Sequence, residues 1–139
     1  STSRSVSNLW IVSCNAFTAA EFEIAMKVME EIIYEKKNYD VVMGGNDPIA
    51  LGCIAAMQMT DKTDQVMVYG VDGSPDGKAM IKAGFLEGTA AQSPIKIGEK
   101  AVQTAYSYLA GETVKKHVTI PVELITADNL KLYDMTGWQ

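Results

Sequence analysis

The sequence has few of the residues on which metal sites and histidine catalysis depend, because its 139 residues include one histidine and two cysteines. Cys14 and Cys53 form no Cys-x-x-Cys pair, so the ordinary ligand set of a zinc site cannot be assembled. Cys53 lies in an apolar helical run and is predicted to be a buried thiol. The sequence leaves a disulfide between the two open. It therefore indicates no metal or other cofactor.

Several enzyme motifs are absent as well. The sequence has no Gly-x-Ser-x-Gly elbow, no Gly-x-x-x-x-Gly-Lys phosphate loop and no complete dinucleotide fingerprint. Its single histidine, His117, is predicted to lie near a loop, away from the ends of the strands. We therefore expect a protein that is not an enzyme.

Positive charge is scarce, since 12 Lys and Arg face 17 Asp and Glu, for a net charge of −5 at pH 7. The nearest approach to a basic cluster is the run 115–117, which is too small to indicate duplex binding. No apolar run is long enough to span a membrane. Neither a nucleic-acid partner nor a direct membrane span is expected. The polar opening Ser1–Ser7 lacks an initiator Met and is interpreted as a cut site.

Apolar runs alternate with helical stripes along the chain. Strands are predicted at 8–13, 40–45, 65–71 and 88–92, and helices at 19–35, 49–59, 74–84 and 94–110. The strands are near-continuous apolar runs, which is typical of a parallel sheet covered on both faces. The predicted fold is therefore α/β, a parallel-sheet αβα sandwich, with an extended segment at 117–125 and an irregular tail at 126–139.

Local signals mark where the helices begin and end. Thr18 and Glu21 form a capping box, Asp47 is assigned as the cap of the second helix, and Ser93 as the cap of the last. Gly84 is expected to end the third helix in a left-handed conformation. Pro121 favours an edge or crossing position for the last extended segment.

Polar and aromatic residues follow the predicted strands where each strand ends. These candidates are Asn15 and Phe17, then Asn46, then Asp72, then Gln92. Ligands of open parallel sheets bind outside the carboxyl ends of the strands. Amide and carboxylate groups together satisfy neighbouring hydroxyls, and an aromatic ring can cover the C–H face of a sugar. This edge is predicted to bind a hydroxyl-rich ligand. A glycosidase would need a pair of acidic residues here, and only Asp72 is well placed.

Each candidate also has a structural interpretation. Asp47 is most simply a helix cap, Asn46 suits a turn, and Asp72 followed by glycine is an ordinary turn pair. Phe17 fits a core position, whereas Gln92 before a Ser-Pro helix start has no standard capping role. The coincidence of these residues at corresponding strand ends favours the functional interpretation.

Three motifs carry a resemblance to a known family. The run 46–52 (NDPIALG) resembles the Asn-Asp-x-x-Ala-x-Gly motif of sugar-binding proteins of the periplasmic-binding-protein type I superfamily. The run 68–77 (VYGVDGSPDG) resembles their Gly-x-Asp-Gly-x-Pro-Asp-Gly segment. The run 88–94 (GTAAQSP), followed by Ile97 and Gly98, resembles their Ala-Gln-x-Pro and Ile-Gly. Order and spacing agree over most of the chain, and the likeness is greatest to ribose-binding proteins.

The resemblance implies a site and a missing part. It assigns sugar hydroxyl contacts to Asn46, Asp72 and Gln92, whereas an ungapped alignment places Ala20 at the stacking aromatic, which Phe17 matches only with a shift. Residues 8–125 correspond to part of a carboxy-terminal sugar-binding lobe that lacks its first strand and helix. The helix at 94–110 normally packs on the amino-terminal lobe, so we expect it to repack or to pair with another copy as in a swapped dimer.

The implied function is that of an extracytoplasmic solute-binding component of a sugar ABC transporter, periplasmic or lipid-anchored. It would bind a monosaccharide such as ribose and pass it to an ABC permease. Two alternatives stay open: the effector-binding core of a lactose-repressor-type regulator, and a sugar-sensing chemoreceptor module. The Asp-Gly-Ser-Pro-Asp-Gly wording at 72–77 favours transport.

Overall fold

The computed structural model describes residues 9–12, 21–35, 38–60 and 66–138. In this part of the chain one sheet has the strand order β1-β2-β3-β4-β5. The strands are β1 (Leu9–Val12), β2 (Val41–Gly44), β3 (Met67–Asp72), β4 (Gly88–Ala91) and β5 (Glu123–Thr126). The helices are α1 (Glu21–Tyr34), α2 (Asp47–Gln58), α3 (Pro75–Ala83), α4 (Pro94–Leu109) and a 3-10 turn, η2 (Leu130–Leu132). The predicted α/β fold with a parallel sheet flanked by helices is confirmed.

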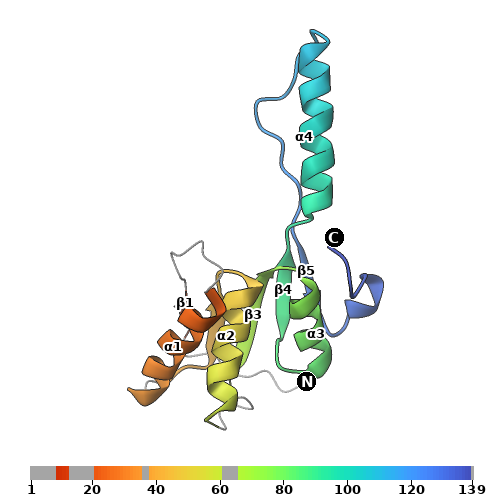
Figure 1. Cartoon of the computed structure of the whole chain (residues 1–139). Coiled ribbons are helices and arrows are strands. Elements are labelled where there is room, and N and C mark those ends of the chain that lie inside the picture. Colours follow the sequence, from red (N-terminus) through yellow and green to blue (C-terminus); the bar gives the residue numbers. More distant parts are fainter. Residues whose placement is uncertain (1–8, 13–20, 36–37, 61–65, 139) are drawn as a thin grey trace.

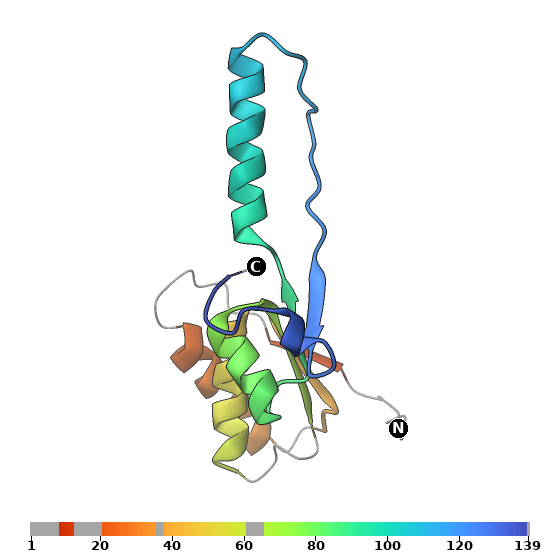
Figure 2. The ribbon, with the colours of Figure 1, turned by 90° about the vertical axis from the view of Figure 1, so that its right-hand side faces the viewer.

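Strand β5 departs from the parallel arrangement of β1 to β4. It pairs with β4 in antiparallel register, with Gly88 opposite Thr126 and Ala91 opposite Glu123. Helix α4 leaves the sheet at the carboxyl end of β4, and the extended segment after it runs back alongside (Figure 2). The chain therefore re-enters the sheet from the end at which it left. This return path makes β5 an antiparallel edge strand.

Helices α1, α2 and α3 lie on the same face of the sheet (Figures 1 and 2). Right-handed connections between strands added in sequence order place every crossover helix on one side. Val42, Val68 and Ile125 face these helices and are at most 2% exposed, whereas Met43 and Leu124 on the opposite face are 38% and 54% exposed. The described residues thus supply one helical layer, and the second layer of the predicted sandwich does not come from them.

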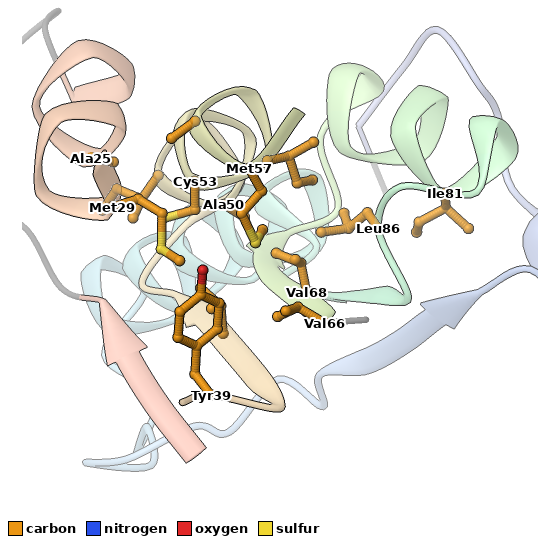
Figure 3. Close-up of a cluster of buried hydrophobic side chains, with 14 of the residues drawn as sticks. Ala25, Met29, Tyr39, Ala50, Cys53, Met57, Val66, Val68, Ile81 and Leu86 are labelled. Carbon is orange, nitrogen blue, oxygen red and sulfur yellow. The ribbon is translucent and has the colours of Figure 1, made fainter. Parts of the chain in front are cut away.

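The core lies between this helical layer and the sheet (Figure 3). Met29 of α1, Cys53 of α2 and Met57 of α2 are fully buried, and Val68 of β3 packs in the same cluster. The prediction that Cys53 is a buried thiol is confirmed. Methionine fills space between the layers, as its unbranched and adaptable side chain allows.

Helix α4 stands away from the rest of the described chain (Figure 1). None of its residues is buried. Ser93, predicted to cap this helix, occupies the N-cap position in a left-handed conformation (φ 50°), and its side chain makes no capping hydrogen bond. The predicted helix start at Ser93 and Pro94 is confirmed, whereas the capping hydrogen bond expected from the Ser93 side chain is absent. By contrast, Gly84 ends α3 with φ 82°, as predicted.

A buried lysine holds the segment that follows η2. Lys78 of α3 is 0% exposed, and its Nζ donates to the backbone carbonyls of Asp134 and Gly137, the latter at 2.6 Å. Backbone carbonyls accept from the ammonium group, and the carboxylates of Asp134 and Asp47 favour its charge. Lys78 therefore fixes residues 134–137 against α3.

Replacing Lys78 by methionine is expected to release this segment. The change keeps the buried stem but removes both donors, and hydrogen bonds to charged groups contribute about 1.5–3 kcal/mol each. Because methionine also removes the desolvation cost of the buried ammonium, we expect the free energy of unfolding to fall by about 1–3 kcal/mol, less than the sum of both bonds, and proteolysis near residue 134 to accelerate. Urea denaturation and limited proteolysis measure the two effects. Lys82→Met, at an exposed position of the same helix, is the control and is expected to leave both unchanged.

Candidate functional site

The carboxyl ends of β3 and β4 bring two of the predicted site residues into contact. The side-chain amide of Gln92 donates from Nε2 to Oδ1 of Asp72 at 2.6 Å. Asp72 has φ 115° and Ser93, next to Gln92, has φ 50°. Positive φ is costly for residues other than glycine, and such strain gathers at functional sites. Strain therefore falls on one member of the Asp72–Gln92 pair and on the residue that follows the other.

Asn46 follows β2, the neighbouring strand. Its Oδ1 accepts from the backbone N–H of Ile49 at 2.9 Å, and its Nδ2 donates to Oε2 of Glu21 at 2.6 Å. Asn46 is thus the cap of α2. The assignment of that cap to Asp47 is wrong, because α2 already includes Asp47 as its first residue. Asn46 keeps one N–H donor and one oxygen lone pair for a ligand.

Asp47 lies below this edge and is fully buried. Its Oδ2 accepts from the backbone N–H of Ser74 at 2.7 Å and from the Ser74 hydroxyl at 2.6 Å. Its Oδ1 accepts from the Thr89 hydroxyl at 2.6 Å. One carboxylate therefore connects the start of α2 with the start of α3 and with β4.

The edge is electrostatically acidic. Burial raises the pKa of Asp72, the nearby carboxylates of Asp47 and Glu21 raise it further, and the hydrogen bond from Gln92 lowers it. Among the residues that the structure describes, no group of three or more His, Cys, Asp and Glu side chains is arranged to hold a metal ion. The edge offers amide donors and carboxylate acceptors, the groups that satisfy hydroxyls.

The sequence analysis did not assign Glu21 and Asp47 to the site, and it named two site residues that the structure does not describe. Asn15 and Phe17 lie outside the described residues, as does Thr18 of the proposed capping box. Glu21 was assigned to that box, yet its carboxylate accepts from Asn46 across 25 positions of sequence. One feature of the sequence agrees with the burial of Asp47, but its meaning is clear only once the structure is known. Glycine stands at positions 70 and 77, where a Cβ would collide with the Asp47 carboxyl group.

No helix in the described part of the chain is both long enough and apolar enough to cross a membrane.

Residues 7–113 match the family model described as periplasmic binding protein domain. The chain is 38% identical over 100 residues to the ribose import binding protein of Escherichia coli, covering 72% of this chain and 33% of that protein. It is 34% identical over 111 residues to the D-ribose/D-allose-binding protein of Pseudomonas aeruginosa, covering 77% and 35%.

A solved structure shows the same arrangement. An ABC transporter solute-binding protein from Bacillus halodurans, with bound myo-inositol, superposes with a TM-score of 0.76 at 33% identity, over 81% of this chain and 39% of that one. The relatives are binding proteins rather than enzymes, and the chain spans about a third of the length of the curated relatives it matches. The chain belongs to the periplasmic binding protein family and resembles its ribose-binding members.

Proposed function

We propose that this chain is the carboxy-terminal, sugar-binding part of an extracytoplasmic solute-binding protein that serves an ABC permease. The observation that carries the proposal is the Asp72–Gln92 contact at the ends of two adjacent parallel strands, with Asn46 at the end of the next. These groups match the donors and acceptors of vicinal hydroxyls. Membership of the periplasmic binding protein family supports the assignment of a ligand site to this edge.

The ligand class follows from the relatives together with the polarity of the edge. Two relatives are named for ribose and allose, and a third was solved with myo-inositol. All three ligands are small neutral rings rich in hydroxyl groups. A carboxylate that accepts from two neighbouring hydroxyls forms charge-assisted hydrogen bonds, which are the strong kind. The proposed ligand is a monosaccharide, with ribose as the first candidate.

The proposal is tested by isothermal titration of the full-length protein with D-ribose, D-allose, myo-inositol and D-glucose. Micromolar or tighter binding of one of them is expected, and Asp72→Ala or Asn46→Ala should weaken it about tenfold or more, because a buried hydroxyl loses its partner at a cost of about 1–3 kcal/mol. Asp76→Ala, at an exposed position, is the control. Binding of a phosphorylated sugar alone would indicate a regulator instead.

We also propose that the 139-residue chain by itself self-associates through α4. Ile95, Val102, Tyr106 and Leu109 recur at helical spacing and are 55%, 58%, 72% and 81% exposed. Soluble monomers rarely expose an apolar stripe of this kind. The chain covers about a third of the length of its relatives. We therefore infer that the apolar stripe of α4 packs against the same stripe of a second copy of the chain.

Light scattering coupled to gel filtration tests this self-association. The chain is expected to form dimers whose fraction rises with concentration, and the double variant Tyr106→Lys, Leu109→Lys is expected to be monomeric. Tyr34→Lys changes a tyrosine of α1 that is 87% exposed and serves as the control. A chain that stays monomeric at every concentration contradicts the proposal.

A further inference from the structure

We propose that Asp47 is the positioning residue of the sugar site: its buried carboxylate holds the turn 72–74 so that Asp72 meets Gln92. The inference rests on the proposed function, because it assigns a role within the same site. Asp47 itself is 0% exposed, so it acts through the residues it holds and not by contact with a sugar.

The direction of the hydrogen bonds around Asp47 is determined by the backbone. The Ser74 hydroxyl accepts from the N–H of Gly77 at 2.9 Å, and the Thr89 hydroxyl accepts from the N–H of Gly73 at 3.0 Å. Each hydroxyl therefore has its proton left to give to Asp47. The backbone N–H of Ser74 is a third donor. All three hydrogen bonds that the described residues make to the Asp47 carboxyl group come from donors, so an acceptor is required at both of its oxygens.

An ionised carboxylate meets this requirement and an amide does not. Asparagine at position 47 would place an NH2 group against donors, either Ser74 or Thr89. Leaving buried donors without an acceptor is costly, more so than the loss of the hydrogen bond itself. Asp47 also lies at the first turn of α2 and next to the N-cap of α3, where negative charge is favoured.

The backbone around Asp47 leaves no room for another arrangement. A Cβ at Gly77 would lie 2.6 Å from the carboxyl carbon of Asp47, and one at Gly70 would meet its Oδ1. The β3–α3 connection therefore closes directly on this carboxylate. The close approach explains why a side chain so near the strand ends is completely covered.

The anchored turn is the strained one. Asp72 has φ 115° and Gly73 has φ 68°, so two consecutive residues hold positive φ. Strain of this kind persists only when surrounding contacts enforce it. The N–H groups of Gly73 and Ser74 are held by Thr89 and Asp47, immediately after Asp72. Relaxation of the turn would rotate Asp72 away from Gln92.

Charge provides a second, independent consequence. Two carboxylates act on Asp72, Glu21 from α1 and Asp47 from α2, and both raise its pKa, while Gln92 from the β4 end lowers it. Removing the charge of Asp47 is therefore expected to lower the pKa of Asp72. Sugar binding that needs an ionised Asp72 would then persist to lower pH.

The decisive variants of the full-length protein are Asp47→Asn and Thr89→Val, with Thr89→Ser as the rescue. Asp47→Asn is expected to weaken sugar binding about tenfold or more and to move the acid limb of affinity to lower pH. Thr89→Val removes the bridge to Gly73 and is expected to weaken binding several-fold, about threefold or more. Thr89→Ser keeps the hydroxyl and should bind nearly as the unmodified protein does.

Readouts separate this role from a purely structural one. If Asp47 only stabilised the fold, the folded fraction of Asp47→Asn would bind sugar with unchanged affinity, which would overturn the proposal. Asp76→Asn makes the same charge change at an exposed site and should alter neither the affinity nor the acid limb.

One measurement does not depend on sugar. The side-chain amide protons of Gln92 in nitrogen-15 NMR spectra report the Asp72 contact, and they are expected to shift in Asp47→Asn and in Thr89→Val but not in Thr89→Ser. Unshifted Gln92 resonances in both variants refute the positioning role, whatever the ligand. An unmodified protein that binds no sugar while Gln92 shifts as expected refutes only the sugar site.

Discussion

Replacing Gly52 by alanine is expected to lower the free energy of unfolding by about 1–3 kcal/mol. Gly52 is in α2 where that helix crosses α1, and a Cβ there would collide with the backbone carbonyl of Phe22. It would also lie 3.1 Å from the Cβ of Ala25 and from the backbone nitrogen of Met26. A backbone carbonyl cannot move aside as a flexible side chain can. The two helices would have to separate, and their packing covers the core around Met29.

Helix propensity alone would make Gly52→Ala stabilising. The sign of the change in the free energy of unfolding therefore tests whether the steric contact dominates. Alanine in a helix interior is favoured over glycine by about 0.5–1 kcal/mol. Gly98 in α4 meets nothing within 4 Å, so Gly98→Ala should raise stability by that amount. Urea denaturation followed by circular dichroism, at one protein concentration, measures both variants. Gly52→Ala at or above the stability of the unmodified chain would show that α1 and α2 are not in close contact.

Replacing Asp72 by asparagine is expected to raise stability near neutral pH and to weaken sugar binding about tenfold or more. The variant keeps an oxygen that can accept from Gln92, and asparagine tolerates positive φ better than most residues. It loses the charge that partial burial opposes and that two neighbouring carboxylates repel. It also loses the charge-assisted hydrogen bonds to sugar hydroxyls. The residue expected to destabilise the empty site is thus the one proposed to bind the ligand.

The pH dependence of stability shows whether the charge of Asp72 stabilises or destabilises the folded protein. The folded-state pKa of Asp72 is raised above its ordinary value of 3.8, so between the two values the folded protein keeps a proton that the unfolded chain has lost. Stability contributed by Asp72 therefore falls as pH rises through that window and stays low above it. The stability advantage of Asp72→Asn should be small at pH 3 and larger at pH 7. Denaturation at both pH values measures it, and an advantage that shrinks with rising pH would contradict the raised pKa.

Local sequence signals predicted most of the described elements. Ser74 and Pro75 mark the start of α3 and Gly84 marks its end, because capping and positive φ depend on residues close in sequence. The same locality explains the placement of Asp72 and Gln92 at the ends of β3 and β4. Once strands and helices alternate, parallel pairing brings those ends together.

Local signals could not decide between Asn46 and Asp47. Both residue types cap helices well, and a helix start displaced by one residue exchanges their roles. The outcome depends on Ser74 and Thr89, which lie 27 and 42 positions away in sequence and supply the donors that bury Asp47. The hydrogen bond between Asn46 and Glu21 could not be predicted either, because a capping-box pattern considers only residues within one helical turn.

The sequence by itself determined the alternation of helices and strands, the edge of the sheet at which polar residues collect, and the motifs of the family. Tertiary structure alone decided that α1 to α3 share one face of the sheet, that β5 runs antiparallel, and that Asp47 is a buried acceptor. Periodicity, caps and turns arise from interactions within a few residues. The burial of a carboxylate and the direction of a returning strand depend on which distant segments become neighbours.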